Sequence, residues 1–194
     1  DRYAEDKISL SLPSTRVDAF NVDLANEFSR NGRRSGLTFA PEGGSERLRR
    51  VINKMVSKDD LISTVTTAYA QGWRQVKLYF MCGLPTETDD DVLQIADLAK
   101  KVIATGRSVT GSRDIRCTVS IGGFVPKPHT PFQWCAMDTS ASIYEKQGWL
   151  KEEARASGGV ELKVHDRETS WLEGVFARGD RALCDVLELA FKNG

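Results

Sequence analysis

The chain has 194 residues, and its 27 Lys and Arg residues balance its 27 Asp and Glu residues. This length suits one compact domain, or one domain with a small appendage. The zero formal net charge provides no overall attraction to nucleic acid or to an anionic membrane. Because no apolar run reaches about 18 residues, we expect no transmembrane helix and a cytoplasmic protein.

Hydrophobic periodicity predicts an alternation of strands and helices. Ser57 with Asp60, and Thr88 with Asp91, have the spacing of capping boxes that open helices. In chain order we expect a strand over 7–12, a helix over 17–30, a strand over 36–40, a helix over 45–54, a helix over 58–71, a strand over 75–81, a helix from 88 past 103, a strand over 116–122, a helix over 139–156, a strand over 160–164 and a helix over 180–192.

Strands separated by helices of this length imply parallel β-α units with right-handed crossovers. We therefore expect an α/β fold with about four such units and a small α/β extension at the C-terminus. Four units amount to half of an eight-stranded barrel or to most of a small doubly wound sheet. In either architecture ligands gather where the strands end.

The loops that follow the expected strands carry suitable groups. Ser14 and Arg16 offer a hydroxyl and a guanidinium for a carboxylate or phosphate. Glu42 could accept hydrogen bonds from a sugar diol or an ammonium group, and Gly83 lets a planar ring approach the backbone. The fourth loop, over 122–132, is Pro-rich and forms a rigid apolar lip. Each loop alone is also explained by ordinary turn and capping chemistry, but four in register favour a binding site.

The four cysteines lie far apart in the sequence, without a C-x-x-C pair, at positions 82, 117, 135 and 184. We expect reduced thiols in or near a core, and no iron–sulfur framework within this segment. The two histidines, His129 and His165, are also well separated. The sequence therefore predicts neither a metal site nor a catalytic residue in this segment.

Three segments together resemble the core of radical S-adenosylmethionine (SAM) enzymes. They are LTFAPEGGSERLR over 37–49, the Ile52-Asn53-Lys54 run, and YFMCGLPTET over 79–88. The type is that shared by methylthiotransferases, the oxygen-independent coproporphyrinogen dehydrogenase and B12-dependent radical SAM proteins. FVPKPHTPF over 124–132 and ARGDR over 177–181 are similar to a group often linked to a cobalamin domain.

The resemblance implies a partial TIM-type barrel. Residues 1–135 would supply strands three to six of the barrel, and residues 136–194 a C-terminal extension packed on it. Trp134, Trp149 and Trp171 would pack this extension against the barrel.

The resemblance also implies a role for each strand-end loop. Glu42 would contact the SAM ribose or the methionine ammonium, and Lys54 would pair with the methionine carboxylate. The other implied positions are Gly43 and Ser45 in the loop of Glu42, Gly83 and Glu87 in the turn behind the adenosyl group, Phe124 and Val125 against the adenine, and Ser14 and Arg16 as weaker contacts to SAM or substrate.

The chain departs from the family in lacking the C-x-x-x-C-x-x-C loop that holds a [4Fe–4S] cluster. It starts at Asp1 without Met, which reads as a start inside a larger protein. We expect a missing N-terminal half to hold the cluster. The parent enzyme would then generate a 5′-deoxyadenosyl radical that abstracts hydrogen from an unknown substrate. Cobalamin is a further possible cofactor, and the segment alone should be inactive.

Two other interpretations stay open at this stage. The chain could be a non-catalytic fragment that contacts RNA or a protein partner through its arginine clusters. Those clusters are Arg30, Arg33 and Arg34, and Arg47, Arg49 and Arg50, although interleaved acids favour solvated helix faces. It could also belong to an iron-free α/β-barrel enzyme that binds a phosphate at these loops.

Overall fold

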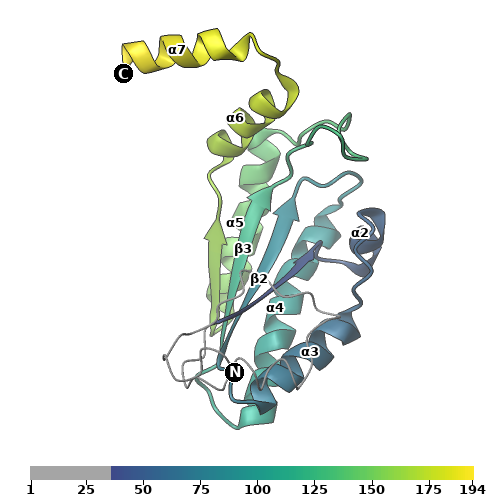
Figure 1. Ribbon diagram of the computed structural model, residues 1–194. Helices are drawn as coiled ribbons and strands as arrows, with labels where there is room; N and C mark the ends of the chain where they lie inside the picture. The colour runs from purple at the N-terminus through teal and green to yellow at the C-terminus, as the bar shows by residue number, and fades with distance from the viewer. Residues whose placement is uncertain (1–35) are drawn as a thin grey trace, which may run out of the picture.

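The computed structural model describes residues 36–194 (Figure 1). Ser14, Arg16 and the elements expected over 7–12 and 17–30 lie outside the described residues. The described elements are β1 (Leu37–Glu42), α2 (Glu46–Val51), α3 (Lys58–Ala70), β2 (Gln75–Cys82), α4 (Asp89–Thr110), β3 (Arg116–Gly123), α5 (Ser140–Ala156), β4 (Val160–Val164), α6 (Arg167–Arg178) and α7 (Leu183–Asn193).

The four described strands form one parallel sheet in the order β1-β2-β3-β4. Each strand therefore lies beside the next one in the sequence. A doubly wound sheet reverses its strand order part-way across, whereas a barrel adds each new strand on the same side. The sequential order identifies the sheet as the wall of a partial TIM-type barrel, as the sequence predicted.

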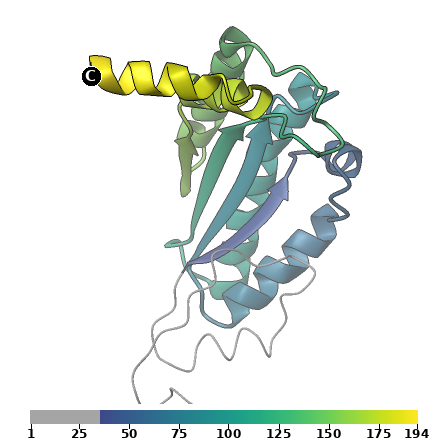
Figure 2. The ribbon, with the colours of Figure 1, turned by 45° about the horizontal axis from the view of Figure 1, so that its top comes forward.

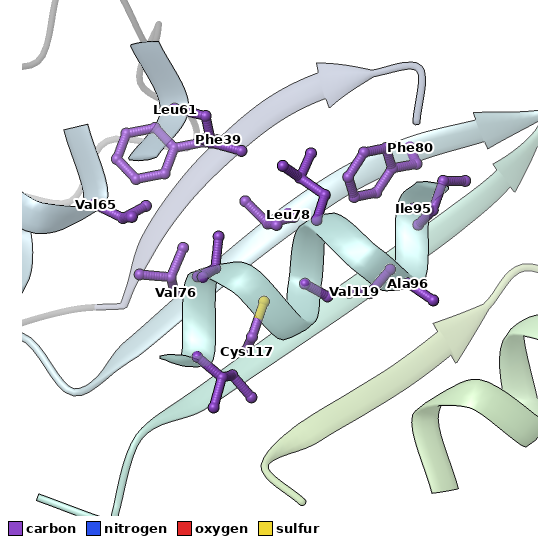
Figure 3. Close-up of a cluster of buried hydrophobic side chains, with 14 of the residues drawn as sticks. Phe39, Leu61, Val65, Val76, Leu78, Phe80, Ile95, Ala96, Cys117 and Val119 are labelled. Carbon is purple, nitrogen blue, oxygen red and sulfur yellow. The ribbon is translucent and has the colours of Figure 1, made fainter. Parts of the chain in front are cut away.

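The hydrophobic core lies between the sheet and the helices (Figure 3). Phe39, Leu78 and Val119 point from successive strands toward α3 and α4, where Leu61 and Ile95 meet them. Both predicted capping boxes are present, at Ser57 for α3 and at Thr88 for α4. These caps fix where the two covering helices begin and so where the preceding strand-end loops finish.

The other face of the sheet is polar. Because side chains alternate along a strand, the residues between the core positions face away from α3 and α4. They are Thr38, Ala40, Lys77, Tyr79, Met81, Thr118, Ser120, Glu161 and Lys163, all polar or aromatic except Ala40 and Met81. Closed (β/α)₈ barrels fill this side with layers of Val, Ile and Leu, whereas this wall carries mainly polar side chains there.

The C-terminal segment differs from the expectation in several ways. β4 continues the sheet by pairing with β3, and α6 was not predicted. α7 extends away from the sheet (Figure 2) and buries none of its residues. Trp149 packs against the core, but the expectation for Trp134 and Trp171 was wrong, because they are 87% and 62% exposed. None of the described helices has the length and hydropathy needed to cross a membrane.

Candidate functional site

Three strand ends meet at one edge of the sheet and bring the expected loops together. The Phe124 N–H donates to the Cys82 carbonyl at 2.8 Å, so the ends of β2 and β3 are joined directly. Leu48, Leu84 and Phe124 form a small buried cluster there, and the Phe132 ring meets Phe124 edge-on at 6.3 Å. The loops after β1, β2 and β3 thus share one apolar support, with Val125 also buried beside it.

Glu42 ends β1 in a left-handed conformation, with φ of 69°. This conformation costs a residue with a side chain about 1–2 kcal/mol and marks strain that functional sites often retain. Its Oε1 lies 3.7 Å from Lys54 Nζ, and both side chains are partly exposed. Burial raises the pKa of Glu42, while the Lys54 ammonium acts in the opposite direction. The site therefore holds an opposite-charge pair at the strand end.

The loop after Glu42 is pinned to the start of α4. Gly44 packs so closely that a Cβ there would overlap the Asp91 carbonyl oxygen. Ser45 caps α2 by accepting from the Leu48 N–H at 3.0 Å, and its hydroxyl donates to Asp91. The Ser45 hydroxyl is buried in this role, so it shapes the loop and is not free for a ligand.

The Asp91 carboxylate accepts several hydrogen bonds from this region. Arg47 pairs with its carboxylate and also donates to the Thr86 carbonyl at 2.7 Å. Burial acts to raise the pKa of Asp91, but the hydrogen bonds from Arg47, Ser45 and Thr88 outweigh it and lower the pKa to about 2. α2 is thereby tied to the turn that follows β2.

The turn after β2 rests on a buried charge network. Gly83 has φ of 83° and donates its N–H to Glu87 Oε1 at 2.8 Å. Lys146 of α5 lies 2.8 Å from the same oxygen and 2.6 Å from Asp138 Oδ2. Within residues 36–194, no hydrogen-bond partner reaches the buried Glu87 Oε2. Glu87 therefore acts on the shape of the turn, through an ion pair with a residue 59 positions away.

The most informative residue that the sequence reading missed is Arg49. Its side chain is almost fully buried, at 2% exposure. It donates to the carbonyls of Gly43 at 3.0 Å, Gly44 at 2.8 Å and Val56 at 2.6 Å. Burial lowers the pKa of Arg49, opposed by the nearby Glu46 carboxylate. The sequence pattern did not predict the burial of Arg49, because a charged residue with other charged residues on a short helix is expected to be exposed.

Comparison with known proteins identifies the family of this chain. Residues 2–99 match the family model described as the radical SAM superfamily. The chain belongs to the radical SAM superfamily. It is also 34% identical, over 181 residues, to the uncharacterized protein MJ0966 of Methanocaldococcus jannaschii. That alignment covers 93% of this chain but only 37% of the relative's length.

Membership of the radical SAM superfamily implies SAM and an iron–sulfur cluster as the general cofactors. The residues at the strand ends fit the first of these by their chemistry. A carboxylate beside an ammonium complements the ammonium and carboxylate of an amino acid, and the buried Leu84 and Phe124 cluster supports the loops beside this pair. Among residues 36–194, no group of three or more His, Cys, Asp or Glu is arranged to hold a metal ion.

Two expectations about side chains need correction. Arg49 cannot contact RNA or face solvent, because it is buried against backbone carbonyls. Arg47 is engaged with Asp91 and Thr86. Of the cysteines, Cys82 and Cys117 are buried and half-buried Cys135 packs against the Leu48, Leu84 and Phe124 cluster, as expected, but Cys184 is exposed.

Proposed function

We propose that this chain forms the SAM-holding wall of a radical SAM enzyme. The observation that carries the proposal is the Glu42–Lys54 pair, which lies at a strand end in a chain of this superfamily. When bound, a cluster-ligated SAM supplies 5′-deoxyadenosyl radical chemistry for abstracting hydrogen from a substrate. The residues of this chain hold and orient SAM and keep water from it.

The amino-acid end of SAM is assigned to Glu42 and Lys54. The Glu42 carboxylate accepts from the methionine ammonium or a ribose hydroxyl, and Lys54 pairs with the methionine carboxylate. At 3.7 Å the two side chains already attract each other, so a zwitterionic ligand exchanges one ion pair for two. The charges of the amino-acid end and of the protein pair are thus each matched after binding, which limits the cost of their desolvation.

The adenosyl end is assigned to the edge formed by the turn after β2 and the end of β3. Gly83 and the residues up to Glu87 shape the turn, and Phe124 and Val125 present their backbone to the adenine. Gly43 allows the loop after β1 to pack closely on α2, since a Cβ there would come within 3.3 Å of Leu48 and the Arg49 amide. Ser14 and Arg16 are proposed as weaker contacts to SAM or substrate.

The remaining parts of the enzyme belong to a longer protein. The chain spans 37% of the length of its archaeal relative, and we propose that a preceding half holds the [4Fe–4S] cluster. The polar interior face of the sheet, with Lys77, Tyr79 and Ser120, favours a hydrophilic substrate. Kinship with methylthiotransferases and use of cobalamin stay predictions.

Equilibrium binding of SAM to the full-length, cluster-reconstituted protein tests the assignment. Glu42→Gln and Lys54→Met should each weaken binding about 10- to 100-fold, because a hydrogen bond to a charged group contributes about 1.5–3 kcal/mol. Lys100→Met is the matched control, since it removes the ion pair between α4 and Glu153 of α5, away from the strand ends. Unchanged affinity in both site variants would overturn the assignment.

A further inference from the structure

The buried guanidinium of Arg49 connects the two loops that carry the Glu42–Lys54 pair. Gly43 and Gly44, whose carbonyls it binds, directly follow Glu42. The Val56 carbonyl, its third acceptor, lies two residues after Lys54. The Arg49 carbonyl in turn accepts from the Lys54 N–H at 2.8 Å. Each charge of the pair is therefore within two residues of a hydrogen bond made by Arg49.

Both loops need such a restraint. Glu42 and Asn53, the residue before Lys54, have φ of 69° and 57°. Residues with a Cβ seldom adopt this conformation unless the surroundings enforce it. The restraint on both loops comes from one planar group that donates in several fixed directions. Lysine, with a single ammonium on a flexible stem, does not reproduce that geometry.

We infer that Arg49 is a positioning residue that sets the separation and direction of Glu42 and Lys54, and so the selectivity for the amino-acid end of SAM. The inference rests on the proposed function, because it assigns that end of SAM to the same pair. It adds that discrimination between SAM and adenosyl compounds without an amino-acid group depends on a buried side chain that touches neither ligand.

The test compares two ligands in the full-length protein. SAM carries an ammonium, a carboxylate and a sulfonium, whereas 5′-methylthioadenosine keeps the adenosyl group with a neutral thioether sulfur and lacks the amino-acid group. Arg49→Lys should weaken SAM binding at least tenfold and leave 5′-methylthioadenosine binding within about twofold. Arg50→Lys is the matched control, because Arg50 is the next residue, is exposed, and its side chain pairs, among the described residues, only with Glu46 at 3.8 Å.

A merely structural role gives a different result. Equal weakening for both ligands, or no change for either, overturns the inference. If Arg49→Lys does not fold, the wild-type protein labelled with ¹⁵N-arginine gives a second measurement. The Nε–H signal of Arg49 should shift on addition of SAM but not of 5′-methylthioadenosine, and an unmoved or equally shifted signal counts against the inference. Failure of the proposed function is seen separately, as wild-type protein that binds no SAM or as unaffected SAM binding in both Glu42→Gln and Lys54→Met.

Discussion

Replacing Lys146 with Met tests the buried network that holds the Gly83 turn against α5. Lys146 lies 2.8 Å from Glu87 and 2.6 Å from Asp138, and the three side chains are 10%, 2% and 23% exposed. Methionine preserves most of the packing but leaves two carboxylates together without a cation. Breaking a buried pair costs about 3–5 kcal/mol, and the partial exposure of Asp138 places our expectation at about 3 kcal/mol at pH 7.

The pH dependence makes the test sharper. Burial acts to raise the pKa of Asp138, but hydrogen bonds from Lys146 and Ser142 outweigh it, and the pKa lies below its usual value of 3.8. Such a carboxyl adds stability above its unfolded pKa and loses it as the pH falls through the folded pKa. Without Lys146, the main group that lowers the pKa of Asp138 is gone, and burial then raises this pKa. The deficit of the variant should therefore be full at pH 7 and shrink toward about pH 4.

Urea unfolding followed by tryptophan fluorescence, at pH 7 and pH 4.5 in the full-length protein, measures this deficit. Trp149 on α5 packs against the core and reports on its loss. Lys151→Met removes the same charge from the same helix, outside the network, and should cost under about 1 kcal/mol. Adding Glu87→Gln to Lys146→Met should recover part of the loss. A deficit below about 1 kcal/mol at pH 7, or one that is equal at both pH values, would refute the reasoning.

Two further predictions concern packing and thiol chemistry. Gly44→Ala should lower the free energy of unfolding by about 2–3 kcal/mol, because its Cβ would overlap Asp91. Gly148→Ala in α5 is the control: its Cβ meets no atom within 4 Å, so the change should be neutral or stabilising. Thermal melts of the two variants would contradict this prediction if Gly44→Ala unfolded at the same temperature as Gly148→Ala. Iodoacetamide at pH 8 should modify exposed Cys184 before Cys82 and Cys117, since burial raises the pKa of both buried thiols to about 12, and peptide mass spectrometry would reveal the opposite order.

The sequence alone determined the order of elements from β1 to β4. Alternating apolar positions such as Leu78 and Phe80, and capping boxes such as Ser57 with Asp60, act over a few residues. Their outcome can be read locally for that reason. The motif around Glu42 and the GLPTE turn were also sufficient to indicate the superfamily that the comparison confirmed. α6 was missed, and Trp134 and Trp171 were misplaced, because aromatic content does not say which surface a side chain faces.

Only the tertiary structure decided what supports the candidate site. The sequential strand order chose the barrel wall over the doubly wound sheet. Arg49 reads as one exposed arginine among three, yet the fold closes around it and supplies three carbonyl acceptors. Lys146 meets Glu87 across 59 positions of sequence. Burial and long-range pairing depend on which segments come together in space, and local sequence patterns do not determine these tertiary contacts.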